Sequence, residues 1–415
     1  MSKRRFLFGS IVLLAACSTV STPSPTTEPA AAGSSALKRI DAKALKDAVD
    51  ATARQLLVPG ALVLLRTPQG ELTISYGTTQ IGRTSPPRAD THFRIASNTK
   101  TMTAALIVQM AQEGKLDLRD PVSKYVPGVP DGGHITIAEL LEMRSGLYNY
   151  LNAPEIAMSS DHDPSRVWSP QELLAIAFAH APNFPPGTEF EYSNTNYALL
   201  GLVAERVDGK PLARSMQDRL FGPLGLEQTT LPASHVSTLP EPFSHGYLYG
   251  SSSVAFTGTP PYSPEIQAAA RAGTLLPNDD TDLNHSFAAA AGGVVSTASD
   301  LGVWIHALVA GRVFDAPYQR RWLDSLRPED PAKPQGQAYG YGITRLHWGP
   351  NSIYFHGGET AGYNSFMGYD PASQVTLVIW TNLTVSLDEL PTANVLMLKV
   401  LDQIYVLSPL TPRSP

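Results

Sequence analysis

The sequence predicts a mixed α/β fold of the α+β type, with one antiparallel sheet built from both ends of the chain and an α-helical lobe inserted between them. Strand-like runs occur near residues 61–76 and again at 352–381. The region between them, about 116–310, is dominated by helical patterns and strong turn signals. Hydrophobic residues make up 43% of the 415 and charged residues 16%, so the chain can bury a substantial core.

Residues 1–17, MSKRRFLFGSIVLLAAC, have the pattern of an export signal. Basic positions 3–5 precede a short apolar run and small residues, and the stretch is too short to span a bilayer comfortably. The only cysteine, Cys17, ends a Leu14-Ala15-Ala16-Cys17 run that resembles the bacterial lipobox. We expect Cys17 to carry a lipid and anchor an exported lipoprotein to a membrane of the bacterial cell envelope. An ordinary secretory signal that happens to contain a cysteine is the alternative, and which membrane holds the anchor stays open.

A flexible tether and a single folded domain are expected after the signal. Residues 18–36 are Ser, Thr, Pro and Ala with almost no large apolar side chain, so they cannot form a core. The domain is placed at 37–410 and begins with a helical pattern at 37–56. Runs at 61–66 and 72–76 around Pro68-Gln69-Gly70 predict a hairpin, and 97–113 predicts a helix ended by Gly114. Residues 247–285 predict a long surface excursion, and long loops of this kind are often lids or walls of binding sites.

Strands return near the C-terminus. The runs 352–356, 363–369 and 375–381 are β-rich, with a turn at 370–373. A last helix is expected at 389–406, with apolar positions at Leu390, Val395, Leu398, Leu401 and Ile404.

The first chemical motif is Ser97-Asn98-Thr99-Lys100 at the start of the helix predicted over 97–113. Residues three apart share a helix face, so the Lys100 amine can approach the Ser97 hydroxyl. Serine is a weak nucleophile that needs a base, and a desolvated lysine can act as one. The spacing alone is weak evidence, because an N-cap serine and a surface lysine give the same pattern.

Two further motifs follow in order. Tyr192-Ser193-Asn194 offers a phenol for proton relay and an amide that both donates and accepts, although such a sequence is more often a simple turn. His356-Gly357-Gly358-Glu359 follows a predicted strand, and its glycines allow a substrate to approach the backbone closely.

Together the motifs resemble the active-site set of serine β-lactamases, D-alanyl-D-alanine carboxypeptidases and related esterases, the class C β-lactamase-like penicillin-recognising serine hydrolases. The segments LEMRSGLYNY (141–150), PGTEFEYSNTNY (186–197), LFGPLGL (220–226) and GGVVST (292–297) resemble the family too. The resemblance covers about residues 40–405 and implies a β-lactamase/transpeptidase-like fold, with the active site between sheet and helical lobe.

The resemblance also implies roles. Ser97 would attack the substrate carbonyl and become an acyl-enzyme, with Lys100 and Tyr192 sharing the proton transfers. Asn194 would position the substrate amide, and His356, which stands where many relatives carry lysine, would polarise the site and steer a substrate carboxylate.

The oxyanion hole would be the backbone N–H groups of Ser97 and Glu359, and one such donor is typically worth about 3 kcal/mol of barrier. Two positions depart from the family pattern. Met143 replaces a histidine, and Glu359 replaces the Ser or Thr that follows the third-motif glycine in many relatives. Arg345 is a candidate cation for a substrate carboxylate, although one residue of register would change its face.

These observations predict a serine hydrolase of the cell envelope, with a D-alanyl peptide as the leading substrate. A β-lactam or an ester is the near alternative, because the same machinery serves all three. A non-catalytic penicillin-binding envelope protein is the alternative from another class. The net charge of −6 gives no basic footprint for nucleic acid. No cofactor or metal site is expected, since the sequence has no phosphate-binding loop, dinucleotide fingerprint or His-x-x-x-His spacing.

Overall fold

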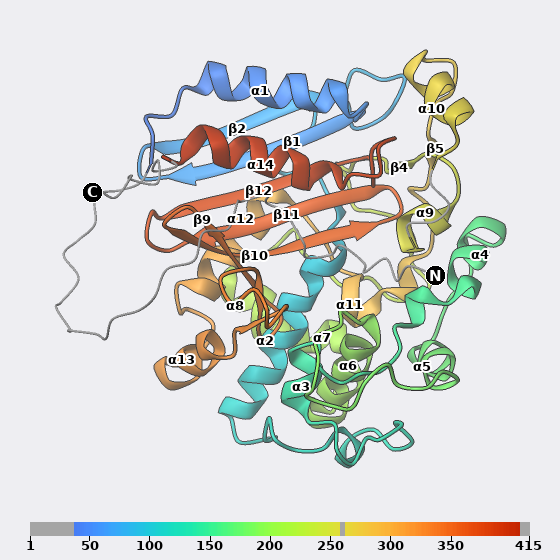
Figure 1. Ribbon diagram of the computed structural model, residues 1–415, viewed down its shortest axis with the longest axis vertical. Coiled ribbons are helices and arrows are strands. Elements are labelled where there is room, and N and C mark those ends of the chain that lie inside the picture. Colours follow the sequence, from blue (N-terminus) through green and yellow to red (C-terminus); the bar gives the residue numbers. More distant parts are fainter. Residues whose placement is uncertain (1–36, 258–261, 407–415) are drawn as a thin grey trace.

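The computed structural model describes residues 37–257 and 262–406. Its centre is an antiparallel sheet of eight strands in the order β2-β1-β12-β11-β10-β9-β8-β7 (Figure 1). The strands are β1 (Gly60–Thr67), β2 (Gly70–Gly77), β7 (Arg327–Pro328), β8 (Ala338–Tyr339), β9 (Thr344–Trp348), β10 (Asn351–Thr360), β11 (Tyr363–Asp370) and β12 (Val375–Thr381). The predicted signal and tether, residues 1–36, lie outside the described residues.

Strands from the two ends of the chain meet at the β1–β12 pair. Ala61 lies opposite Thr381, and Arg66 lies opposite Thr376. Every residue of β12 and the first six of β1 are buried, because helices cover both faces of the sheet here. The predictions of one sheet built from both ends, and of the hairpin at 61–76, are confirmed.

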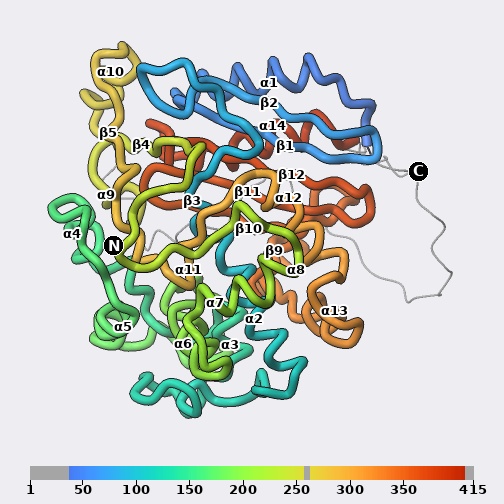
Figure 2. The backbone as a smooth tube through the Cα atoms, turned by 180° about the vertical axis from the view of Figure 1, so that it is seen from behind, coloured from blue at the N-terminus to red at the C-terminus, as the bar shows by residue number. Residues whose placement is uncertain are grey.

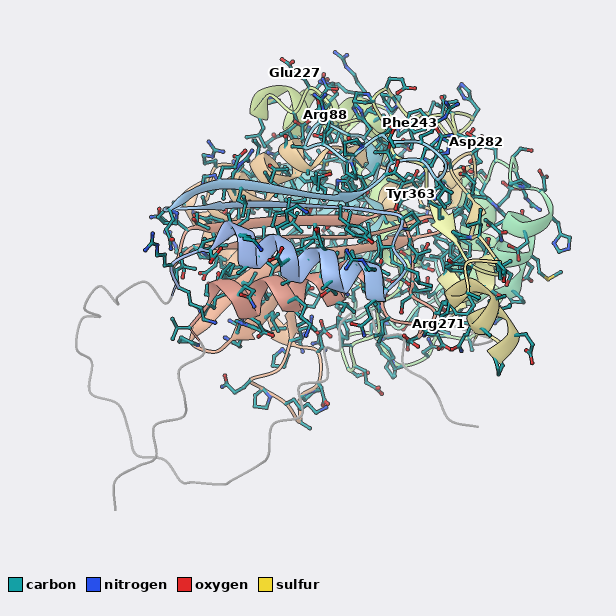
Figure 3. The ribbon with its side chains drawn as sticks, turned by 90° about the horizontal axis from the view of Figure 1, so that it is seen from above. Arg88, Glu227, Phe243, Arg271, Asp282 and Tyr363 are labelled. Atoms are coloured by element: carbon teal, nitrogen blue, oxygen red, sulfur yellow. The ribbon has the colours of Figure 1, made fainter. Side chains whose placement is uncertain are left out.

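Helices α1 (Ala42–Gln55) and α14 (Thr392–Ile404) lie side by side on one face of the sheet (Figure 3). Helix α1 starts at its N-cap Asp41 and buries Leu45, Val49 and Ala53. The last helix is shorter than the predicted 389–406, and not all of its apolar positions are buried. Its buried residues are Thr392, Ala393, Leu396, Met397, Val400, Leu401 and Ile404, whereas Val395 and Leu398 are half-buried and Leu390 precedes the helix and is 45% exposed.

The helical lobe lies on the other side of the sheet, away from α1 (Figure 2). It contains α2 (Thr99–Gln112), α3 (Ile137–Leu141), α4 (Pro154–His162), α5 (Pro170–Phe178), α6 (Asn194–Asp208), α7 (Leu212–Met216), α8 (Gly222–Leu224) and α11 (Ala289–Gly292). The lobe was predicted to reach residue 310. Instead, α12 (Ala298–Val309) packs on β11 and β12 and so belongs to the sheet layers. Helix α13 (Ala316–Asp324) follows α12 in the C-terminal part of the chain.

The segment 247–285 is more structured than a surface excursion. It holds β4 (Tyr247–Leu248) paired with β5 (Asn278–Asp279), and α9 (Ser252–Thr257), which packs on α4 and β10. Helix α10 (Pro264–Arg271) is joined to the loop before α14 by an ion pair between Arg271 and Asp388, 2.8 Å. Tyr249, Phe256 and Tyr262 are buried, so the segment forms a wall beside the end of β10. Within the described ranges, no helix combines the length and apolar character needed to cross a bilayer.

Candidate active site

Ser97 lies on a 3-10 turn, Ala96–Asn98, directly before α2, so the helix predicted over 97–113 begins two residues later than expected. Ala96 has a φ of 48°, which residues with a side chain rarely adopt. The turn is held from outside by the pair β3 (Phe93–Arg94) and β6 (Val295–Ser296) and by the Ile95 N–H, which donates to the Val294 carbonyl at 3.1 Å. Backbone strain at this site is therefore supported by the lobe.

Lys100 is fully buried beside Ser97. Its Nζ lies 3.0 Å from Ser97 Oγ, 2.7 Å from Asn194 Oδ1 and 2.7 Å from the Ala291 carbonyl oxygen. Burial lowers the pKa of Lys100 well below its usual value, because the charged form is desolvated. The amine is thus placed and tuned to take a proton from Ser97.

Tyr192 and Asn194 come from the start of α6. Burial raises the pKa of Tyr192 well above its usual value, and a hydrogen bond with Ser97 opposes this effect only in part. Lys100 Nζ lies 4.8 Å from the centre of the Tyr192 ring. Asn149 Oδ1 accepts hydrogen bonds from the Asn194 backbone N–H at 3.1 Å and from Asn194 Nδ2 at 3.3 Å, which leaves Asn194 Oδ1 turned to Lys100.

His356 sits on β10 with only 3% of its surface exposed. Its Nε2 lies 3.2 Å from the Tyr339 hydroxyl, and its Nδ1 lies 2.6 Å from the Gly357 carbonyl. Desolvation and the nearby Lys100 lower its pKa to about 3. The ring is therefore neutral at physiological pH, and the expected role of His356 in polarising the site and steering a substrate carboxylate stays a prediction.

The end of β10 approaches the Ser97 turn through a glycine. A Cβ on Gly358 would lie 2.1 Å from the Ile95 carbonyl oxygen and 2.5 Å from Ser365 Oγ, so only glycine fits. A Cβ on Gly357 would meet nothing closer than 3.7 Å, since it points to the other face. Strand β9 pairs with β10 only as far as Phe355. The following residues of β10 therefore contact the Ser97 turn instead of β9.

Glu359 follows this close approach. Its Oε2 accepts a hydrogen bond from Asn364 Nδ2 at 3.3 Å. The side chain keeps some solvent exposure, yet the surrounding protein desolvates the carboxyl and raises its pKa to about 8. A carboxyl group with a pKa perturbed in this way is a candidate functional residue.

Two other sequence candidates have clear positions. Arg345 pairs with Tyr354, so it lies on the same face of the sheet as His356, but one strand farther from Ser97. A role for Arg345 in binding a substrate carboxylate stays a prediction. Met143, in place of the family histidine, has a φ of 61°, and its sulfur accepts from the Ser193 N–H at 3.4 Å.

Comparison with known proteins agrees with this geometry. Residues 45–402 match the family described as Beta-lactamase. The chain belongs to the beta-lactamase family. The match covers the sheet and the helical lobe, so this fold and family prediction is confirmed.

Several members and structural neighbours of the family resemble the chain. A D-stereospecific amidohydrolase from a Streptomyces species matches with a TM-score of 0.72 and 30% sequence identity. The matched region covers 87% of this chain and 98% of the amidohydrolase chain. The D-amino acid amidase of Ochrobactrum anthropi SV3 has a TM-score of 0.71 and 27% sequence identity, and the match covers 87% of this chain and 97% of the amidase chain. The D-alanyl-D-alanine-carboxypeptidase/endopeptidase AmpH of Escherichia coli K12 is 31% identical over 246 residues, 56% of this chain and 58% of AmpH. Protein flp of Staphylococcus aureus MW2 is 32% identical over 182 residues, 42% of this chain and 35% of the relative. The chain thus spans less than two thirds of these two curated relatives.

Some contacts of this beta-lactamase-family site were not predicted from the sequence. The Ala291 carbonyl is a backbone group without a sequence signature, although it adjoins the family-like segment 292–297. Asn149 lies inside the family-like segment 141–150, which was its only signal. Tyr339 could not be placed beside His356 without the register of the sheet. Over the two described ranges, no cluster of three or more His, Cys, Asp or Glu side chains could hold a metal ion.

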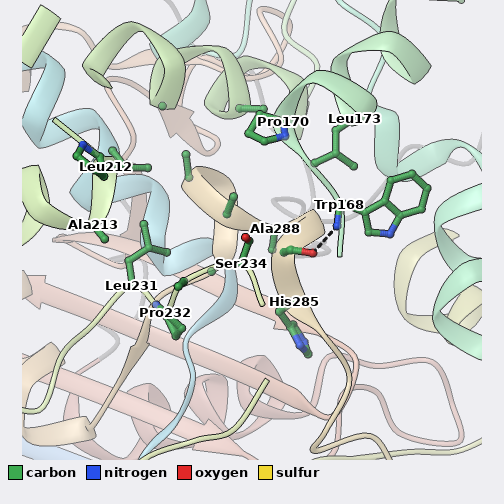
Figure 4. Close-up of a pocket in the computed structure, with 18 of the residues that line it drawn as sticks. Trp168, Pro170, Leu173, Leu212, Ala213, Leu231, Pro232, Ser234, His285 and Ala288 are labelled. Atoms are coloured by element: carbon green, nitrogen blue, oxygen red, sulfur yellow. Dashed lines mark hydrogen bonds between the residues drawn. The ribbon is translucent and has the colours of Figure 1, made fainter. Parts of the chain in front are cut away.

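A cavity of about 330 Å³ lies in the helical lobe and is lined in part by Ala289 and Ala290 of α11 (Figure 4). Its lining is mostly apolar and includes Trp168, Leu173, Leu212, Leu231 and His285. Neither Ser97 nor Lys100 lines it, so it is separate from the reacting atoms.

Proposed function

We propose that the protein is a serine hydrolase that works through an acyl-enzyme on Ser97. The observation that carries this proposal is the 3.0 Å approach of Ser97 Oγ to a fully buried Lys100 amine whose pKa is lowered. A neutral amine at this distance is a base for the hydroxyl proton.

The proton path can be written from the described groups. As the Ser97 Oγ–carbon bond forms, the Oγ proton moves to Lys100 Nζ, and the N–H groups of Ser97 and Glu359 stabilise the oxyanion. When the bond to the leaving group breaks, Tyr192 gives its proton to the leaving nitrogen or oxygen and regains one from Lys100. A phenol with a raised pKa is suited to this relay because it stays protonated. Water then attacks the acyl-enzyme, its proton returns Ser97 to the hydroxyl form, and the acid is released.

The substrate class we propose is a derivative of a D-amino acid, with a D-alanyl peptide as the leading case. The D-stereospecific amidohydrolase, the D-amino acid amidase and AmpH support this choice, since the name of each of these similar proteins gives D-stereospecificity or a D-amino acid or D-alanyl substrate. A β-lactam or an ester remains the alternative substrate for the same nucleophile. Penicillin binding without turnover of any substrate would instead favour the non-catalytic penicillin-binding alternative.

The proposal is tested by intact mass after exposure to benzylpenicillin and to p-nitrophenyl acetate, together with hydrolysis assays on D-alanine amide and L-alanine amide. We expect a covalent adduct or turnover that Ser97→Ala abolishes, and preference for the D-amide. Ser193→Ala is the matched control, because the Ser193 hydroxyl is buried and has no hydrogen-bond partner within the described structure. Activity that survives Ser97→Ala would overturn the mechanism, and equal rates on both amides would overturn the substrate class.

We also propose export and membrane anchoring through Cys17. This proposal is supported by the Leu14-Ala15-Ala16-Cys17 run alone. Mass analysis of the mature N-terminus in a bacterial host should find a diacylglyceryl group on Cys17. A mature chain without lipid, or unchanged membrane fractionation of Cys17→Ser, would contradict it.

A further inference from the structure

We propose that strand β11 sets the distance between the two oxyanion donors, with Asn364 holding the donor peptide on β10 and Ser365 holding the turn that carries Ser97. Both side chains act through neighbouring groups and are therefore positioning residues. The proposal rests on the proposed function of Ser97 and identifies two further residues on which its transition state depends.

The first observation concerns the peptide group that joins Gly358 to Glu359. Asn364 Nδ2 donates to the Gly358 carbonyl oxygen at 3.2 Å, so this oxygen is turned toward β11. In a planar trans peptide the carbonyl and the N–H point in opposite directions, so the Glu359 N–H points away from β11. Strand β9 pairs with β10 only as far as Phe355, so this N–H lies at an open edge of the sheet. That direction is the one an oxyanion donor needs.

The Asn364 side chain is itself held in one orientation. It is buried, and its Oδ1 accepts a hydrogen bond from the Ala393 N–H, in the first turn of α14, at 2.8 Å. With its oxygen fixed there, the amide turns its nitrogen toward the Gly358 carbonyl. A hydrogen bond to that carbonyl also polarises the N–H of the same peptide, which strengthens it as a donor. Helix α14 therefore fixes the donor peptide of β10 through Asn364.

The next residue of β11 holds the other donor. Side chains alternate along a strand, so Ser365 faces the helical lobe whereas Asn364 faces α14. Asn98 Nδ2 donates to Ser365 Oγ at 2.8 Å and to the Ile95 carbonyl at 2.9 Å. Ser365 Oγ donates to the same carbonyl at 3.3 Å. These hydrogen bonds join β11 to residues on both sides of Ser97.

Buried polar side chains usually make hydrogen bonds, so the contacts alone would fit a purely stabilising role. The two positions are distinguished by what they hold, because consecutive residues of one strand reach both halves of the oxyanion hole. Donors of this kind act only when they are placed to within about 0.5 Å of the productive geometry. Loss of either contact should therefore reduce stabilisation of the transition state more than it reduces substrate binding.

The test is the preference for a carbonyl over a thiocarbonyl. Acylation is measured with p-nitrophenyl acetate and with its thiono analogue, whose C=S bond is longer and whose sulfur is a weak acceptor. Each kcat/KM is divided by the rate constant of the same ester with hydroxide. For the wild type we expect the corrected ratio to favour the carbonyl by about 10²-fold or more, the size of one oxyanion-hole donor. Ser365→Ala should lower the ratio by about tenfold, through kcat and not KM.

Asn364→Asp separates orientation of the peptide from anchoring of the helix. The carboxylate keeps an acceptor for the Ala393 N–H, and aspartate is a favourable residue at a helix N-terminus, but it cannot donate to the Gly358 carbonyl. We expect the ratio to fall by about tenfold, as it should in Asn364→Ala. Because both contacts set one distance, the double variant of Asn364→Asp with Ser365→Ala should lose little more than the weaker single variant.

Asn351→Ala is the matched control. Asn351 is a buried asparagine at the far end of β10, and its Nδ2 donates to the Trp348 carbonyl at 3.1 Å. The variant should lower Tm and leave the ratio unchanged. An unchanged ratio in both Asn364→Asp and Ser365→Ala, an equal fall in Asn351→Ala, or a wild type without preference for the carbonyl would each overturn the proposal. If Ser365→Ala does not fold, Asn364→Asp decides.

The two levels of the proposal fail differently. Acylation that depends on Ser97, with the same ratio in the wild type and in the β11 variants, would overturn only the positioning role. Absence of any reaction that depends on Ser97, with these esters and with D-alanine amide, would overturn the proposed function and the positioning role together.

Discussion

Lys100 is the residue on which the chemistry depends most directly. Lys100→Arg keeps a cation that does not lose its proton, and Lys100→Met removes the amine, so neither can serve as the base. We expect the rate of acylation by p-nitrophenyl acetate to fall by roughly 10²- to 10⁴-fold in both. Stopped-flow measurement of p-nitrophenol release checks this. Lys333→Met, at a side chain that is 76% exposed, is the control. An arginine variant acylated within tenfold of the wild type would argue against Lys100 as the base.

Gly358 is a second single-residue test. Gly358→Ala would force a Cβ against the Ile95 carbonyl, and such overpacking typically costs about 1–3 kcal/mol. It should also move β10 away from the Ser97 turn, so activity should fall more than stability alone would explain. Urea unfolding compares it with Gly357→Ala, where the added Cβ has room. Similar free energies of unfolding for the two variants would show that the close approach is not as tight as the structure has it.

Glu359 should make stability depend on pH. Its pKa is raised from about 4.5 to about 8 in the folded protein, so the folded state holds this proton more tightly than the unfolded state. Its contribution is favourable below pH 4.5 and is lost as the pH rises from there to 8. Glu359→Gln should therefore raise Tm more at pH 8 than at pH 5. Thermal unfolding at both values, with the exposed Glu71→Gln as control, checks the sign, and a larger gain at pH 5 would contradict it.

The residues that meet at the site were predictable from sequence, but their ionisation was not. Ser97 and Lys100 are three apart, and the two later motifs recur in a fixed order, so the cluster could be anticipated. The neutral state of His356 arises chiefly from desolvation in a site that Tyr339 and Lys100, from distant parts of the chain, help to bury. The motifs therefore predict which residues meet at the site, whereas tertiary packing determines their ionisation.

At the scale of elements, the start of α6 is fixed by a neighbouring segment instead of its own cap. The N-cap Ser193 makes no side-chain hydrogen bond, and Asn149 Oδ1 accepts from the first N–H of the helix instead. Asn149→Ala should cost about 1 kcal/mol, as the loss of a helix cap does. It should also lower kcat, because Asn194 is no longer held toward Lys100. Asn149→Asp keeps the acceptor oxygen and should recover most of both effects in parallel Tm and kcat measurements. Equal behaviour of the two variants would contradict this role.

Element positions were predicted better than element faces. The hairpin and the three C-terminal strands were expected within a few residues, because their apolar runs are bounded by turns. For α14, the apolar positions Val395 and Leu398 are only half-buried, whereas Leu396 and Val400 are buried. Both β11 and the neighbouring α1 cover this helix. The local pattern of apolar residues does not indicate this arrangement.

At the scale of the whole molecule, the ends of the described chain close on each other. Leu37 forms a β-bridge with Tyr405, and the Lys38 N–H donates to the Ile404 carbonyl at 2.8 Å. The sheet joins β1 to β12 in the same way, over more than 300 residues of sequence. The helical lobe is therefore an insertion whose position depends on the contact between the two ends, and damage at the termini should reach the active site.

This dependence gives a test by truncation. A chain that starts at residue 37 should unfold with a Tm within about 3 °C of the full-length protein and keep its acylation rate. A chain that starts at residue 57 lacks α1 and exposes the surfaces of α14 and β2 on which Leu45 and Val49 are buried. Each such side chain contributes about 1.5–3 kcal/mol, a large part of a domain's net stability of roughly 5–15 kcal/mol. We expect the shorter chain to lose cooperative unfolding and acylation at Ser97 together. Cooperative unfolding at the original Tm without α1 would show that the C-terminal strands and the lobe hold the site alone.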